Sequence, residues 1–512
     1  MDSNKRSKNS LMLMILTFVS RLLGIIRSRT VAIFFGATNL ADIINFSFNI
    51  PNNFRKLFAE GSLSSAYIPQ FASLADDKGS SQNLLNEMQG FQLLITTFLV
   101  ILTFLFKTQI FSFLSDFKDP NAIQLGSIFL FYFVLFLVAI IFATLYAGVL
   151  HSHQRFLIAA VSPLIFSIAV ISSLYLLTTE IGAFSFVVGV LIGGFSQALI
   201  NFIALRRVGY KFRFSFNFKN ESFLKVLKAW GPITAVTLLA VIAQQIAFYF
   251  ASTLKEGSIT AFSNAIILYQ APYGIFYSGI ATVFFPAMAL AFYSKDDNKL
   301  VELVAKALLY IATFLIPSAI VLTTFSSETT AVVLQSGLFS YQDTLLTSSI
   351  LKWFAIGMPI VAFYSFFQRV YYSTNQLKRA LIGSIVVVSL DIVLTYLLLK
   401  FYPKAEFISL ANSISHLVGL IILIYYWPYK GKLINYLKQF AILLIANVPL
   451  LIYAISYRVF NNREWLISGS TKRNLLILFV LYLGALIITL ISYTIAKVDY
   501  LNIFKPQSPQ SK

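Results

Sequence analysis

The sequence predicts an all-α polytopic membrane protein, and three observations support that prediction. Of the 512 residues, 58% are hydrophobic and only 12% are charged, against about 25% charged residues in soluble domains. The mean hydropathy is +0.78. Apolar runs of about 20 residues, the length of a helix that crosses a bilayer, recur along the whole chain.

These runs predict about 14 transmembrane helices. Lys5 and Arg6 imitate the start of a signal peptide, but Arg21 and Arg27 interrupt the first run, so we expect it to remain as the first span. The expected spans are residues 11–35, 41–71, 91–114, 126–150, 156–177, 183–205, 229–254, 262–292, 303–325, 348–373, 380–399, 406–427, 436–457 and 474–496.

The distribution of basic residues predicts the orientation. The net charge is +19, and because Lys and Arg lie between apolar runs we attribute it to the positive-inside rule rather than to nucleic-acid binding. A cytoplasmic N-terminus places more of them inside than outside. An even number of spans then puts both termini in the cytoplasm. The most basic segment has one acid, Glu221, and seven cations: Arg206, Arg207, Lys211, Arg213, Lys219, Lys225 and Lys228.

This basic segment also separates two halves of six spans each. Spans two and eight both carry an early proline, Pro51 and Pro272, and a later one, Pro69 and Pro286, before an Asp-Asp loop. Helices interrupted at matching positions are typical of duplicated transporters, so we expect helix breaks near the early prolines. The alternative is that proline is simply common in membrane helices. The predicted parts are an N-terminal lobe (1–208), a cytoplasmic linker (209–228), a C-terminal lobe (229–428), and two further spans with a tail (429–512).

Ionisable residues inside the spans are the main functional signal, because an arginine at the bilayer centre costs about 2.5 to 3.5 kcal/mol unless it meets water or a partner. The first two spans hold Arg21, Arg27, Arg29, Asp42, Arg55, Lys56 and Glu60. The later spans hold Lys306, Lys352, Arg369 and Asp391.

Two of the arginines predict an anion-binding cavity. Arg29 can extend to a headgroup and Lys56 can pair with Glu60 one turn away, whereas Arg21 and Arg27 have no local acid. These two lie about 120° apart on an ideal helix, so a broad cavity wall or a bend must hold both. Arginine binds phosphate in a bidentate manner. The expected ligand is a lipid with a phosphate or diphosphate head and a tail that stays in the bilayer.

Three blocks near the N-terminus have a specific pattern: V-S-R-L-L-G-I-I-R (Val19–Arg27), F-F-G-A-T-N-L-A-D (Phe34–Asp42) and I-P-N-N-F-R-K-L-F-A-E-G-S-L-S-S-A-Y-I-P (Ile50–Pro69). Weaker likeness continues through Phe363–Ser373 and Asp391–Thr395. Together they resemble the MurJ, or MviN, family of lipid II flippases, and the resemblance covers essentially the whole chain.

The resemblance implies the fold of the multidrug/oligosaccharidyl-lipid/polysaccharide exporters: two pseudo-symmetric six-helix lobes around a central cavity, and two C-terminal helices that form a groove for the lipid tail. It also implies that the chain flips lipid II, the undecaprenyl-diphosphate-linked peptidoglycan precursor, from the inner to the outer leaflet by alternating access. The implied location is the cytoplasmic (inner) membrane, and the implied partners are lipid II, membrane lipids and other cell-wall synthesis proteins. The implied substrate-binding residues are Arg21, Arg27, Asp42, Arg55 and Glu60.

The chain departs from the family pattern at three places. Ser28 stands where an acid commonly follows the second arginine, and Asn49 replaces a basic residue. Ile266–Ile267 occupies the position of an Asp-Arg pair, so the third cavity arginine is absent. Lys352 and Arg369 are the candidates for supplying that charge.

Asp391 is a candidate ion site, because an isolated carboxylate in a membrane span is functional by default. Ser389 and Thr395 could complete its coordination. The alternative is that the carboxylate is tolerated where the family often has asparagine. The loop 326–347 and the tail 507–512 are predicted to be polar connectors.

Other chemistry is disfavoured. The chain has no cysteine, which excludes thiolate catalysis and Cys-bound metals, and its three histidines are too dispersed to predict a metal site. No nucleotide-binding or nucleophile motif is present, so we expect a transporter without a cofactor rather than an enzyme. The rival functions are a flippase for another polyprenyl-linked saccharide and a cation-coupled multidrug exporter; the basic first spans disfavour the exporter, whose cavity should be acidic.

Overall fold

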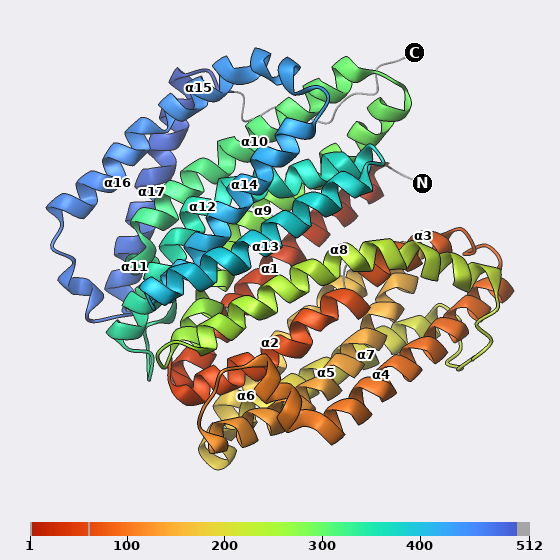
Figure 1. Ribbon diagram of the computed structural model, residues 1–512. Helices are drawn as coiled ribbons and strands as arrows, with labels where there is room; N and C mark the ends of the chain where they lie inside the picture. The colour runs from red at the N-terminus through yellow and green to blue at the C-terminus, as the bar shows by residue number, and fades with distance from the viewer. Residues whose placement is uncertain (1–2, 60–61, 499–512) are drawn as a thin grey trace. The chain divides into compact units, whose positions relative to one another are not determined.

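The computed structural model describes residues 3–59 and 62–498, with side chains only in part before residue 18. Over these residues the protein is mostly helical and has no strands (Figure 1). Twelve segments are long and apolar enough to cross a membrane, and α1 and α2 are further long helices that carry the cluster of charges. The predicted all-α polytopic fold is confirmed.

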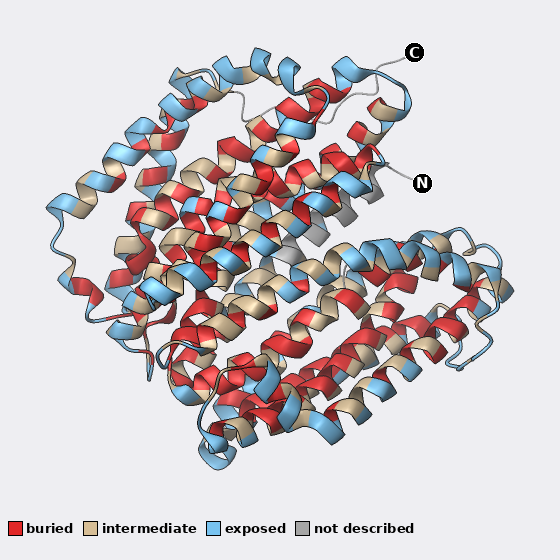
Figure 2. Ribbon diagram, viewed as in Figure 1, coloured by how far each residue is buried: buried red, intermediate tan, exposed pale blue. Residues whose placement is uncertain are grey.

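The first of two compact units comprises Met1–Thr260 and Gly337–Phe339. Within it, α5 packs against α2, α4 and α7, and α1 packs against α6. Large aromatic side chains such as Phe129, Phe133 and Phe136 fill its core, and buried residues gather on the facing sides of the helices (Figure 2). Its helices are α1 (Ser3–Phe35), α2 (Asn39–Phe58), α3 (Ser62–Ala72), α4 (Lys78–Leu114), α5 (Pro120–Ser152), α6 (Phe156–Ile181), α7 (Phe184–Arg207), α8 (Glu221–Ser252) and the first residues of α9 (Ser258–Tyr293).

The second unit comprises Ala261–Ser336 and Ser340–Lys512. In it α12 packs against α10 and α14, α14 against α13, and α16 against α10 and α17. Its elements are the rest of α9, α10 (Asp297–Thr324), α11 (Ser326–Leu334), α12 (Tyr341–Ser373), α13 (Leu377–Phe401), α14 (Glu406–Tyr426), η1 (Lys430–Tyr436), α15 (Leu437–Ala446), α16 (Val448–Phe460), η2 (Arg463–Leu466) and α17 (Lys472–Ile495).

The compact units divide after α8, because α8 packs against α2, α3 and α4. The sequence prediction divides the chain by an internal duplication, which the compact units do not test. Its parts therefore stay a prediction: 1–208, 209–228, 229–428 and 429–512.

Prolines do not interrupt the helices where the sequence suggested. Pro51 lies inside α2, and α9 continues through both Pro272 and Pro286, so the expected breaks at the early prolines are wrong. Span two is divided elsewhere, because α2 ends at Phe58 and Ala59 leaves the helical region with φ −124° and ψ −79°. Proline removes a single N–H donor, and neighbouring groups in a membrane bundle can satisfy the freed carbonyl.

The segment predicted as a polar connector, 326–347, contains the buried helix α11. Thr329 is satisfied inside the unit: its hydroxyl donates to the Phe325 carbonyl at 2.7 Å and lies 2.8 Å from the Tyr482 hydroxyl. Composition therefore misleads here, since Ser and Thr in a helix can bond to the preceding turn and then pack like apolar residues.

Glu328 in α11 carries a buried carboxylate with an unusual environment. Its side chain is 0% exposed, and the nearest cation is Arg463, whose Nη1 lies 4.0 Å from Oε1. Neither oxygen has a hydrogen-bond partner among the described residues. Burial raises the pKa of this carboxyl above its ordinary value. The folded protein therefore holds the proton more tightly than the unfolded chain, and stability falls as pH rises through the raised pKa.

We expect Glu328→Gln to raise the melting temperature at pH 8, because it removes the ionisation that opposes folding. The gain should shrink as the pH falls towards the ordinary glutamate pKa of about 4.3. Thermal unfolding in detergent across this pH range measures it, with the exposed Glu464→Gln as the matched control. An equal or lower melting temperature for E328Q at pH 8 would show that Arg463 fully compensates the carboxylate.

Span thirteen is divided at Asn447, between α15 and α16. The side-chain Nδ2 of Asn447 donates to the Leu443 carbonyl at 2.8 Å and to the Tyr493 hydroxyl at 3.0 Å. That hydroxyl donates to the Thr313 carbonyl of α10 at 2.8 Å. The break in the helix is thus satisfied by side chains inside the unit, as a bilayer without water requires.

Candidate functional site

Helices α1 and α2 bring two cations together in the N-terminal unit. Arg27 and Arg55 are both half-buried, and their like charges repel each other. The Arg27 guanidinium also lies over the ring of Phe166, with Cζ 4.9 Å from the ring centroid, because α1 packs against α6. A cation–π contact contributes about 0.5–2 kcal/mol. Arg27 and Arg55 therefore form a region of positive potential within the first two predicted spans.

Arg21 and Arg29 are half-buried on the same helix as Arg27. Helix α1 is continuous through Gly24, so the structure gives no helix break there to bring Arg21 and Arg27 onto one side. At 100° per residue they remain about 120° apart. The cation placed with Arg27 is Arg55, a juxtaposition that sequence spacing did not reveal.

Asp42 holds a turn of the backbone. Its side chain is 4% exposed, and its two oxygens accept hydrogen bonds from the backbone N–H groups of Gly257 and Thr260, both at 2.8 Å. Gly257 has φ +84°, and a Cβ there would collide with the Ala37 carbonyl oxygen, so glycine is required. The carboxylate thus positions the α8–α9 turn. Its role in substrate binding stays a prediction.

The predicted Lys56–Glu60 ion pair involves Glu60, which lies outside the described residues. Lys56 itself has other partners. Its ammonium group lies 2.5 Å from Gln244 Oε1 in α8 and 3.4 Å from Asn53 Oδ1. These bonds link α2 to α8 inside the N-terminal unit.

In the C-terminal unit, α9 and α12 place Arg369 beside a row of tyrosines. Tyr269, Tyr273 and Tyr277 follow at four-residue intervals, and their rings stack with centroids 5.6 and 4.9 Å apart. The Arg369 guanidinium carbon is 5.5 Å from the Tyr277 centroid, and the Tyr273 hydroxyl donates to Ser365 Oγ at 3.1 Å. Sequence reasoning missed this row, although its i, i+4 spacing is a visible signal.

The other candidate for the missing charge, Lys352, is not beside Arg369. Both are half-buried on α12, but 17 residues separate them along the helix, which is about 25 Å. Ile267 lies ten residues before Tyr277 on α9, about 15 Å away along that helix. Arg369 therefore contacts α9, the helix that lacks the arginine, but about 15 Å along that helix from Ile267.

Asp391 belongs to a buried polar cluster. Its Oδ2 accepts a hydrogen bond from Asn412 Nδ2 of α14 at 3.1 Å, while Oδ1 has no partner in the described structure. The Asn412 carbonyl lies 2.7 Å from His416 Nδ1, and the His416 ring packs edge-on against Tyr364 of α12. Ser389, which we expected to assist Asp391, is exposed. No group of three metal-ligating side chains occurs in the residues described.

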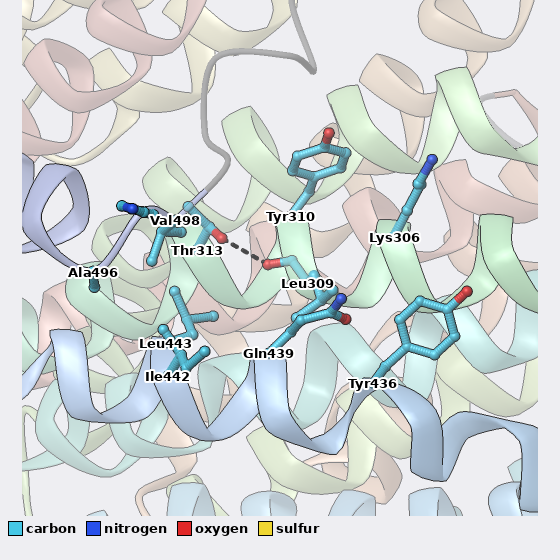
Figure 3. Close-up of a pocket in the computed structure, with 11 residues that line it drawn as sticks. Lys306, Leu309, Tyr310, Thr313, Tyr436, Gln439, Ile442, Leu443, Ala496 and Val498 are labelled. Carbon is cyan, nitrogen blue, oxygen red and sulfur yellow. Dashed lines mark hydrogen bonds between the residues drawn. The ribbon is translucent and has the colours of Figure 1, made fainter.

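A pocket of about 280 Å³ lies in the C-terminal unit between α10, α15 and the end of α17 (Figure 3). Leu309, Ile442 and Leu443 provide apolar walls, and Lys306 and Lys497 provide charge at the pocket. The Thr313 hydroxyl donates to the Leu309 carbonyl at 2.8 Å, so its polarity is satisfied within α10. The chemistry of the walls suits a hydrocarbon chain.

Comparison with known proteins supports one family. Residues 31–494 match the family described as "Lipid II flippase MurJ". A relative from Borreliella burgdorferi named "Probable lipid II flippase MurJ" is 32% identical, over 97% of this chain and 98% of the relative. A relative of the same name from Aquifex aeolicus is 28% identical, over 86% of this chain and 91% of its own length.

Solved structures share the fold. The structure titled "Lipid II flippase MurJ, inward closed conformation" has a TM-score of 0.78 at 24% identity, over 95% of this chain and 98% of its own. An inward-facing multidrug resistance MATE family transporter has a TM-score of 0.68 at 14% identity, over 82% of this chain and 96% of its own. The family model matches residues 31–494, whereas the MATE transporter shares the fold at only 14% identity. The chain therefore belongs to the MurJ family of lipid II flippases.

Proposed function

We propose that this protein moves lipid II from the inner to the outer leaflet of the cytoplasmic membrane by alternating access, as a transporter and not as an enzyme. Its membership of the MurJ family along residues 31–494 is the observation that carries the proposal. The cationic region of α1 and α2 supplies the chemistry, because a diphosphate is an anion that arginine binds well.

In this proposal Arg27 and Arg55 bind the diphosphate, and Arg21 and Glu60 complete the substrate-binding residues. Attraction between these cations and an anionic head group favours the bound state. Asp42 contributes by fixing the α8–α9 turn. The tail of the lipid lies along α15–α17, where the apolar pocket supports a place for hydrocarbon.

Arg369 is proposed to supply in the C-terminal unit the charge that Ile267 lacks. We expect Arg369→Ala to lower the rate of lipid II flipping about tenfold, equivalent to about 1.4 kcal/mol, while Lys352→Ala changes it less. Flipping by purified protein in liposomes measures both variants. A larger loss for K352A than for R369A would reverse this assignment.

The cluster around Asp391 is proposed as the site of a coupling ion, because one carboxylate oxygen is buried with no partner in the described structure. Asp391→Asn should weaken the dependence of flipping on an imposed sodium or proton gradient. An unchanged gradient dependence in D391N would remove the site from the mechanism.

We further propose that both termini of the protein are cytoplasmic and that it contacts other cell-wall synthesis proteins.

Depletion and rescue test the function itself. In cells depleted of their own lipid II flippase, this protein should restore growth and prevent lipid II from accumulating in the inner leaflet. A protein that fails to rescue but transports a different polyprenyl-linked saccharide, or expels cationic drugs, would instead support one of the rival functions.

A further inference from the structure

The connection between α7 and α8 has a regular pattern that transport does not explain. Over residues 210–219 every second residue is aromatic: Tyr210, Phe212, Phe214, Phe216 and Phe218. The residues between them are basic or polar. Residues 210–217 belong to neither a helix nor a strand, and residues 218–219 form a turn. The backbone N–H groups of the alternate residues Lys211, Arg213 and Ser215 all donate to α4, and the aromatic residues alternate with these positions.

Specific contacts hold this segment along α4. The Lys211 N–H donates to Gln82 Oε1 at 2.8 Å, and the Gln82 amide nitrogen donates back to the Lys211 carbonyl at 2.8 Å. Further along, the Ser215 N–H donates to the Asn86 carbonyl at 3.0 Å. A Cβ at Gly90 would collide with the Ser215 carbonyl oxygen, so glycine permits the close approach. The segment is therefore a fixed part of the N-terminal unit.

The aromatic side chains have two environments. Tyr210 is 1% exposed, with its hydroxyl 3.1 Å from Ser81 Oγ. The three middle phenylalanines are exposed: Phe212 by 43%, Phe214 by 39% and Phe216 by 55%. The rings of Phe212 and Phe214 are in contact, with centroids 4.8 Å apart. A contiguous row of exposed aromatic rings marks a surface that another apolar phase covers.

The charge around this row is strongly positive. Every Lys and Arg between residues 206 and 228 is exposed, and the single acid, Glu221, is neutralised by Lys225 at 2.7 Å. The row also begins three residues after the last residue of α7, Arg207, and ends before α8, two helices long and apolar enough to cross the membrane. The segment therefore starts and ends where the chain leaves a bilayer.

We propose that residues 206–219 form an interfacial anchor that binds anionic phospholipids. Phe212, Phe214 and Phe216 enter the acyl region below the headgroups, and the neighbouring Lys and Arg side chains contact lipid phosphates. Aromatic rings beside basic residues at a membrane surface have this preference, and each Lys or Arg near an anionic leaflet contributes about 1 kcal/mol. The assignment depends on α7 and α8 crossing the membrane and is independent of the transported lipid.

The absence of cysteine from the sequence makes a direct test practical. A single cysteine at Phe216→Cys, carrying a nitroxide spin label, reports depth in the bilayer by its relative accessibility to oxygen and to a water-soluble nickel chelate. Asn217→Cys is the matched control, since it is the adjacent exposed residue on the polar side. The full-length protein is reconstituted in vesicles of phosphatidylcholine, with or without phosphatidylglycerol.

We expect the label at residue 216 to lie about 5–10 Å below the phosphates and the label at residue 217 to remain in water. Phosphatidylglycerol should deepen the label at 216. In a Lys211→Gln, Arg213→Gln variant that deepening should be lost, while inorganic phosphate in pure phosphatidylcholine vesicles should not reproduce it. Equal water accessibility at 216 and 217 in both lipids would overturn the proposal and indicate a protein-binding surface instead. If the depth of the label at residue 216 is the same with and without phosphatidylglycerol, the proposed binding of anionic lipid by the basic residues is wrong.

Discussion

Replacing Arg27 with alanine should reduce lipid II flipping at least about 30-fold, because removing one member of a buried charge interaction costs about 2 kcal/mol or more. Arg27 is half-buried, near Arg55 and over Phe166. In the proposed site its loss leaves Arg55 as the remaining arginine of the pair, and one guanidinium group binds a diphosphate less tightly than two. Lysine at this position should restore only part of the rate, since an ammonium group cannot make the bidentate contact.

Two measurements check this expectation: rescue of growth in flippase-depleted cells, and flipping by purified protein in liposomes. Arg29→Ala is the matched control, because it removes the same group two residues away on α1 and is expected to retain rescue. The melting temperature of each variant separates folding from function. Full rescue by R27A would refute the assignment of the diphosphate to this region.

Replacing Asp42 with alanine should lower both stability and transport. The change leaves two buried N–H groups, those of Gly257 and Thr260, without their acceptor, and each such loss costs about 1–3 kcal/mol. Asparagine should be intermediate, since its single carbonyl oxygen can serve one of the two donors. Thermal unfolding and flipping, measured on the same preparations, test the expectation.

A second variant separates the positioning role of Asp42 from direct contact with substrate. Gly257→Ala disturbs the same turn without altering the carboxylate, because its Cβ would meet the Ala37 carbonyl and its φ is positive. We expect G257A to reproduce the losses of D42A. Wild-type stability with no transport in D42A, together with an active G257A, would show that the carboxylate acts on the substrate.

The sequence was sufficient to predict the membrane fold, because each span is a long apolar run and a bilayer leaves few alternatives to a helix. It also located the charged first spans, since charges stand out against such runs. Helix α11 was missed because its Ser and Thr residues look polar in the sequence, whereas in the fold they are buried. The breaks at Pro51 and Pro272 were wrongly expected because proline alone does not end a membrane helix.

The composition of the candidate sites was less predictable than the fold. Arg27 meets Arg55, and Asp391 meets Asn412, across helices that only folding brings together. The departure at Ile267 could be seen in the sequence, but the packing of Arg369 of α12 against Tyr277 of α9 could not. Tertiary packing, and not local pattern, decides these pairs.

The hydrogen bonds around Asn447 also limit what the apolar pocket can accept. Thr313 and Leu443 both line that pocket and both provide carbonyls to the Asn447–Tyr493 contact. Separating α17 from α10 would break these hydrogen bonds inside the bilayer, where no water molecule can replace the lost partners. For the proposed binding of the lipid tail, we expect these bonds to keep the recess of about 280 Å³ in shape, so that it accepts part of a prenyl chain and excludes a glycopeptide head.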